Sequence, residues 1–134
     1  MPNSKVTVRA QVSYVDAYGQ NQSLPATVLE PEYTAQVHGS LDIPDATAAG
    51  DFVIPFGSVD KATAVMLKNS TGQAIDISVN AGDVTYTALP DGKAVLLALP
   101  CTPGLAPITA VTVTTGATQD GAGTVAYDIW GDPV

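Results

Sequence analysis

A chain of 134 residues, 46% hydrophobic and only 13% charged, is long enough for one domain with a buried core and too apolar for a disordered tail. Its 13 acidic residues outnumber 5 scattered basic residues, which argues against binding to nucleic acid or to an anionic membrane. Cys101 has no second cysteine to pair with, and no secretory signal or membrane-length apolar run is present. We therefore expect one domain over residues 1–134, synthesised in the cytoplasm and compatible with later incorporation into a particle.

The first predicted element is a long strand at residues 5–14, where apolar and polar residues alternate with period two. We expect this strand to be half-buried, with its apolar face inward. That face is formed by Val6, Val8, Ala10, Val12 and Tyr14. Residues 1–5 would precede it as a short N-terminal arm. Residues 18–25 are polar and turn-rich, which predicts a loop, and a short strand is expected at residues 26–29.

A second clean alternation at residues 35–43 predicts another strand. Residues 45–50 are the only stretch that is compatible with a helical turn. Residues 52–56 contain Pro55 and suit an edge strand, whereas residues 61–68 are apolar on both faces and suit a central strand. Because a strong turn at residues 69–72 separates that strand from an alternation at residues 75–79, the two are expected to form a hairpin.

Short strands are predicted at residues 84–87 and 94–99, followed by a proline-rich loop at residues 100–107. Residues 108–115 are dense in β-branched side chains, which favours a strand. In the last alternation, Val125, Tyr127 and Ile129 lie opposite Trp130. The sequence therefore predicts an all-β domain with little or no helix, a β-sandwich or jelly-roll-like domain of about eight short strands.

Few residues are suited to catalysis or metal binding. His38 is the only histidine and lies on the polar face of its strand, and Cys101 has no neighbouring cation to activate its thiol. One cysteine and one histidine do not make a zinc site. Asp42, Asp45 and Asp51 flank one loop and leave a calcium site open, although aspartates that form turns explain the same pattern. The sequence also does not exclude a pair of carboxylates that hydrolyses glycosides, but eight aromatic residues are few for a sugar-binding cleft. We predict no enzyme, no cofactor and no metal.

The second half of the chain contains three characteristic stretches: KATAVMLKNSTGQAIDISVN, LPDGKAVLLALP and PITAVTVTTGATQDGAGTVAYDIWGD. Over residues 60–132 this pattern of turns and alternating strands resembles the decoration, or cement, proteins of tailed bacteriophages. The first 45 residues do not contribute to the resemblance. It implies a virion protein on the capsid surface that binds the major capsid protein non-covalently, commonly as a homotrimer, and stabilises the joints between capsomers. No nucleic acid or membrane partner is implied.

Contacts with such a partner are expected where the chain is exposed: the N-terminal arm, the loops at residues 18–22 and 100–107, and the last strand. Trp130 would either pack against a neighbouring subunit or cover the end of the sandwich. The residues predicted to make contact are Pro2, Asn3, Ser4, Lys5, Tyr18, Gln20 and Trp130. Two alternatives stay open: a receptor- or carbohydrate-binding module of a head or tail fibre, which needs an aromatic platform or a calcium loop, and a neck or tail structural protein.

Overall fold

The regular structure of this chain is almost entirely strand. The computed structural model describes residues 4–25, 27–30, 32–98 and 107–134. Its helical content is one three-residue 3-10 turn, η1 (Asn80–Gly82), and no helix among these residues is long and apolar enough to cross a membrane. The prediction of an all-β fold is confirmed. Residues 45–50, the one candidate for a helical turn, form no helix: the chain makes a tight turn there in which the Thr47 amide donates to the Pro44 carbonyl over 3.2 Å.

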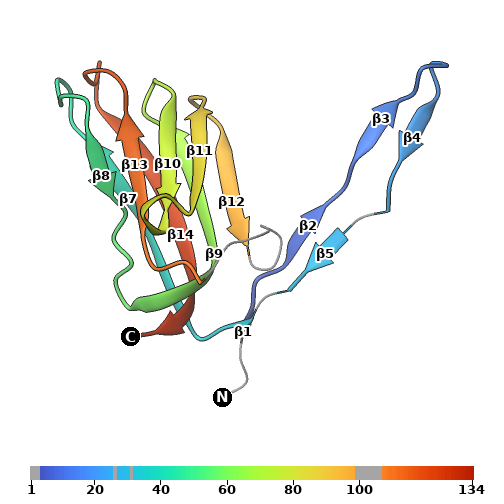
Figure 1. Cartoon of the computed structure of the whole chain (residues 1–134), viewed down its shortest axis with the longest axis horizontal. Helices are drawn as coiled ribbons and strands as arrows, with labels where there is room; N and C mark the ends of the chain where they lie inside the picture. Colours follow the sequence, from blue (N-terminus) through green and yellow to red (C-terminus); the bar gives the residue numbers. More distant parts are fainter. Residues whose placement is uncertain (1–3, 26, 31, 99–106) are drawn as a thin grey trace.

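Two four-stranded antiparallel sheets form the body of the molecule (Figure 1). One sheet has the order β11-β10-β13-β8 and the other the order β12-β9-β14-β7. The strands are β7 (Ala35–Ile43), β8 (Asp51–Val53), β9 (Val59–Ser70), β10 (Ile75–Val79), β11 (Val84–Leu89), β12 (Ala94–Ala98), β13 (Val111–Thr115) and β14 (Gly123–Pro133). The body is thus a β-sandwich of eight strands, as the sequence predicted.

The order of pairing identifies the sandwich topology as a jelly roll. Within these eight strands the first pairs with the last, β7 with β14, and the second pairs with the seventh, β8 with β13. In the same way β9 pairs with β12 and β10 with β11. The body is therefore one long antiparallel hairpin rolled into two sheets, which are closed by the β9–β14 and β10–β13 ladders.

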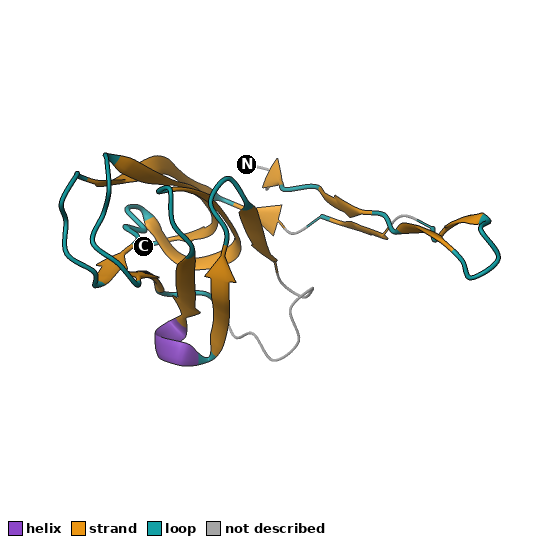
Figure 2. Ribbon diagram, turned by 90° about the horizontal axis from the view of Figure 1, so that it is seen from above, coloured by secondary structure: helices purple, strands orange, loops and turns teal. Residues whose placement is uncertain are grey.

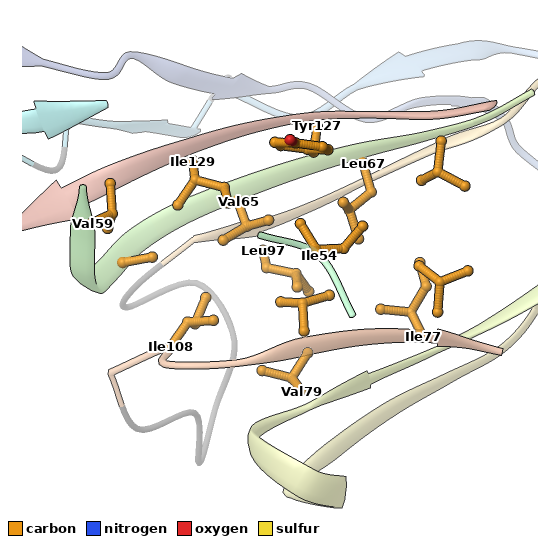
Figure 3. Close-up of a cluster of buried hydrophobic side chains, with 14 of the residues drawn as sticks. Ile54, Val59, Val65, Leu67, Ile77, Val79, Leu97, Ile108, Tyr127 and Ile129 are labelled. Atoms are coloured by element: carbon orange, nitrogen blue, oxygen red, sulfur yellow. The ribbon is translucent and has the colours of Figure 1, made fainter. Parts of the chain in front are cut away.

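The core lies between the two sheets, where side chains from both inner faces meet (Figure 3). Alternate residues of β10 and β13 point inward and are fully buried, as are those of β14 that face them. The largest fully buried side chains include Leu67, Ile77, Leu97, Ile108 and Ile129. Period-two alternation in the second half of the chain therefore predicted the buried faces correctly.

The hairpin predicted between residues 61–68 and 75–79 is wrong. β9 and β10 lie in different sheets, and β10 pairs with β11 instead. The fully buried Asn69 lies at the crossover and bridges it: its side-chain amide donates to the carbonyls of Gln73 (2.7 Å) and Leu89 (3.0 Å). Its Oδ1 accepts from the Thr71 amide (3.0 Å) and hydroxyl (2.7 Å). These bonds replace the ladder that a tight hairpin would have formed.

Residues 4–33 form a long two-stranded ribbon that projects from the sandwich (Figure 2). Its segments are β1 (Ser4–Lys5), β2 (Val8–Ala10), β3 (Ser13–Val15), β4 (Asn21–Ser23), β5 (Thr27–Leu29) and β6 (Glu32–Tyr33). β1 pairs with β6, β2 with β5 and β3 with β4. We call this ribbon the hairpin arm.

The hairpin arm corrects two predictions. The alternating strand at residues 5–14 is present in pieces, but it is not half-buried in a sheet, because no second layer lies on it. The loop predicted at residues 18–25 contains β4, which returns along β3. The arm thus extends well beyond the five residues predicted from the sequence.

Candidate interaction site on the hairpin arm

The root of the hairpin arm is fixed to the sandwich through β14. Directly after β6, the Thr34 amide donates to the carbonyl of Gly131 over 2.9 Å. The Thr63 hydroxyl lies between the two parts, 3.4 Å from the carbonyl oxygen of Glu32 and 3.2 Å from that of Trp130. Gly131 has no room for a side chain, since a Cβ there would lie 2.1 Å from the Lys61 carbonyl oxygen. The arm therefore leaves from a tightly packed junction.

The tip of the arm is a turn organised by Asp16. One oxygen of its carboxylate accepts from the amides of Tyr18 (2.9 Å) and Gln20 (3.0 Å), and the other accepts from the side-chain amide of Gln22 (3.1 Å). Gly19 has a φ of 78°, which closes the turn at little steric cost. The hydrogen bonds from the Gln20 backbone, then from the Gln22 side chain and the Tyr18 backbone, stabilise the charged carboxylate and hold the pKa of Asp16 below its ordinary 3.8.

One face of the arm is apolar and uncovered. In the ladder between β3 and β4, Ser13 lies opposite Ser23 and Tyr14 opposite Gln22. The Leu24 amide donates to the Val12 carbonyl, so the next pair is Val12 with Leu24. Because side chains alternate between faces along a strand, Val12, Tyr14 and Leu24 share one face. Their side chains are 56%, 51% and 51% exposed. The opposite face is mixed: Val15, 64% exposed, lies there beside serines, and the Gln11 side chain donates to the Ser23 hydroxyl over 3.2 Å. A two-stranded ribbon without a covering layer is marginally stable by itself, so this apolar face is suited to a partner.

The predicted contact residues are divided between distant places. Ser4 and Lys5 are exposed in β1 at the root of the arm, whereas Tyr18, 90% exposed, and Gln20 lie at its tip. Pro2 and Asn3 lie outside the described residues, as does the predicted contact loop apart from the exposed Pro107. The structure thus places two predicted groups on the arm, but at opposite ends of it.

Sequence reasoning missed the apolar face between those ends. The available signal was a pair of runs with strand character, residues 6–14 and 21–29, on either side of the turn sequence Asp16-Ala17-Tyr18-Gly19. That arrangement is typical of a hairpin. Treating residues 18–25 as a loop concealed it.

Trp130 lies on the outer face of the sheet β12-β9-β14-β7, away from the arm tip. It is half-buried and lies across from Ala64 on β9 and Gln36 on β7. On the same face, two residues along β9 from Ala64, Met66 lies across from Leu96 on β12, and both are partly exposed. Trp130 therefore covers the outside of a sheet and not the end of the sandwich, and its predicted contact with a neighbouring subunit stays a prediction.

His38 hydrogen-bonds to Asp128 on the same outer face of the sheet, with Nδ1 2.8 Å from Oδ1. The imidazole is an exposed surface group, as predicted, but it has a carboxylate partner that the sequence did not reveal. No serine or cysteine nucleophile hydrogen-bonds to it among the residues that the structure describes. Cys101 lies outside those residues.

An open hollow of about 410 Å³ lies at the end of the sandwich where the turn after β9 meets the turn before β12. Its lining is polar, with both signs of charge: Lys68, Ser70, Thr71, Gly72, Asp91, Gly92, Asp120 and Ala122. The Gly72 amide donates to Asp91 over 2.9 Å, and the buried Gln119 links the neighbouring loops by donating to the carbonyls of Thr71 and Gly121. The hollow has no aromatic side chain in its lining.

The three aspartates considered for calcium have separate partners or positions. Asp45 accepts from the Gly121 amide over 2.8 Å and Asp51 from the Thr114 hydroxyl over 2.7 Å, while Asp42 is exposed on β7. Within the described ranges, no group of three histidine, cysteine or acidic residues is placed to hold a metal ion. Comparison of the chain with protein-family models, with curated proteins and with solved structures gave no match.

Proposed function

We propose that this chain is a virion structural protein, a decoration protein that binds the outer surface of an icosahedral phage head and stabilises the joints between its capsomers. The observation that carries the proposal is the hairpin arm with its exposed apolar face. From Lys5 to Tyr18 the arm spans roughly 45 Å at about 3.3 Å per residue, enough to reach onto a neighbouring subunit. A rigid body with a long binding arm suits a protein that joins other proteins and performs no chemistry on them.

The fold of the body supports the same proposal by analogy. Jelly rolls are common in viral capsid domains and in lectins, and they present loops and sheet edges on a stable core. Fold alone does not assign a function, so the analogy adds to the argument from the arm and does not replace it. The major capsid protein is the proposed partner, and the virion surface the proposed location.

Quantitative co-sedimentation with purified particles of the source virus tests the proposal. We expect the chain to sediment with the shell at a simple ratio to the major capsid protein, with many copies per particle. A handful of copies would indicate a neck, tail or fibre protein instead. Absence from particles, together with no binding of added protein to stripped shells, would contradict a structural role.

A paired variant connects that result to the arm. Replacing Val12 and Tyr14 with serine removes two side chains of the apolar face, each exposed by about half. Losing that apolar contact area is expected to weaken binding to the shell on the order of tenfold or more. The control is Gln11→Ser on the opposite face of the arm, which is expected to bind like the parent chain.

The polar hollow favours a second candidate, a receptor- or carbohydrate-binding module. Lys68, Asp91 and Asp120 offer charged groups that can hydrogen-bond to sugar hydroxyls in an open site. A glycan-binding assay on the parent chain and on Asp120→Ala would test it. Binding that is lost in Asp120→Ala, together with absence from shells, would replace the decoration role with this one.

A further inference from the structure

The four outer edges of the two sheets are protected to very different degrees. An exposed strand edge offers unpaired amides and carbonyls to another chain, and proteins limit this with short strands, bulges, prolines and lysines. β8 has three residues and is followed closely by Pro55, and β12 has five residues directly after Lys93. The ladder to β11 is irregular between Ile75 and Ile77, and Ala88 has a φ of 56°.

The fourth edge, β7, has the fewest of these protections, although Pro44 follows it directly. It is nine residues long, contains neither proline nor lysine, and pairs with β14 in an unbroken register. Within the described ranges, no loop forms a backbone hydrogen bond to residues 35–43. Gly57 approaches Val37 near the beginning of the strand, which leaves the part from Gly39 onward open.

Burial along β7 also indicates a missing neighbour. Its inward-facing residues Val37 and Leu41 pack on the core but stay half-buried, whereas Val125 and Ile129, which face inward from the adjacent β14, are fully buried. A further strand beside β7 would lie next to the half-buried side chains. The β7 edge is thus unsatisfied both in hydrogen bonding and in apolar burial.

The arm and the β7 edge lie on opposite sides of the molecule. In Figure 1 the arm extends to the right beyond β12, while β7 and β8 form the left side of the sandwich. The arm strand from Val8 to Val15 is comparable in length to β7. One copy can therefore supply an arm to a second copy while its own β7 edge receives the arm of a third.

We propose that the hairpin arm of one copy binds the β7 edge of a second copy of this chain, adding a strand to the sheet β12-β9-β14-β7 and covering its own apolar face. The inference rests on the proposed function and makes the neighbouring subunit that the arm reaches a second copy of this chain, so the arm variant would weaken binding to the shell by separating the copies. Such a contact joins two different surfaces, so it repeats from copy to copy and closes into a ring when the geometry permits. The ring would engage a shell at several points at once.

The charge distribution favours contact between arm and body over contact between two bodies. Residues 34–134 contain ten acidic residues against three lysines, so two bodies repel one another. Residues 1–33 contain three acidic residues against Lys5 and Arg9, and the arm is nearly neutral. The arm is the part of the chain that another copy's acidic body repels least.

The test uses three full-length variants and measures molar mass by light scattering after size-exclusion chromatography. Val12→Ser with Tyr14→Ser impairs the arm. Ser40→Lys impairs the edge, because Ser40 is exposed in the open part of β7 and a lysine there opposes the addition of a strand. Thr85→Lys puts the same residue on the protected edge β11, where Thr85 is also exposed. Far-UV circular dichroism verifies that each variant is folded.

We expect the parent chain and Thr85→Lys to be oligomers, and the arm and edge variants each to be single chains. Mixing the arm variant with Ser40→Lys leaves one intact arm and one intact edge, so a two-chain species is expected. A parent chain that stays monomeric across the concentration range, or an oligomer that survives Ser40→Lys, would overturn the inference. Absence of the two-chain species on mixing would also overturn it, and an oligomer that survives Ser40→Lys but not the arm substitutions would indicate arm-to-arm pairing instead. A monomer that still decorates shells would refute this inference and leave the proposed function standing.

Discussion

The sandwich and the hairpin arm are built from the same sequence pattern and differ in what covers it. In β13 the inward residues Val111 and Val113 are fully buried between two sheets. In the arm, Val12 and Tyr14 occupy equivalent alternate positions and remain about half exposed. Alternation thus determines which face of a strand is apolar, but the layer that covers this face has to be supplied from elsewhere.

The same comparison separates stability from binding. Side chains that are buried within one chain contribute to its own folding, whereas apolar side chains on the arm contribute once a partner covers them. Substitutions in the sandwich should therefore lower the free energy of unfolding of the single chain. Substitutions in the arm should leave it almost unchanged and weaken association.

The largest effect is expected from a pair of truncations, Ile77→Ala and Val12→Ala. Ile77 is fully buried on β10, and its truncation leaves a cavity that should cost about 2–5 kcal/mol of unfolding free energy. Val12 is more than half exposed, so its truncation should change that free energy by no more than about 0.5 kcal/mol. Urea denaturation at a protein concentration that keeps the chains separate measures both. Equal losses would mean that the arm packs within its own chain.

Truncation of the buried polar group at the crossover should have the next largest effect. Asn69→Ala removes a side chain that makes four hydrogen bonds, and it leaves the buried Thr71 amide without its acceptor. Unpaired buried groups of this kind cost about 1–3 kcal/mol, and we expect a loss in that range. The matched control is Asn21→Ala on the exposed strand β4 of the arm. Thermal unfolding compares the two, and an unchanged midpoint for Asn69→Ala would show that the crossover does not depend on this network.

Particular residues show how far the sequence alone could lead. The alternation at residues 35–43 gave the bounds of β7, and Val125, Tyr127 and Ile129 were placed inward correctly, because local spacing determines which way a strand's side chains point. Local spacing does not determine which strand lies beside which. The turn at residues 69–72 looked like a hairpin turn, and the four bonds of Asn69 that bridge the crossover connect residues up to 20 positions apart.

The interaction site was harder to predict for the same reason. An uncovered apolar face has the same sequence as a covered one, so the strand at residues 5–14 was assigned to the sandwich. The openness of the β7 edge was equally hidden, because it depends on which strands pair with β7 and on the absence, among the described residues, of a loop bonded to its outer side. Both properties belong to the assembled fold and not to any single segment.

The smallest expected effect is confined to the tip of the arm. The pKa of Asp16 is held below its ordinary 3.8 by hydrogen bonds that the folded turn donates to the carboxylate, chiefly from the Gln20 amide. The turn is therefore stabilised by the charged form, fully above the ordinary pKa, and this contribution is lost as the pH falls through the lowered value. In NMR spectra recorded during acidification, the Tyr18 and Gln20 amides should shift with a midpoint below 3.8, while the amide of the buried Val65 in the sandwich stays in place. Asp16→Asn, which keeps a carbonyl acceptor but cannot titrate, should abolish the shift. A midpoint at or above 3.8, or the same titration in Asp16→Asn, would mean that the carboxylate does not organise the tip.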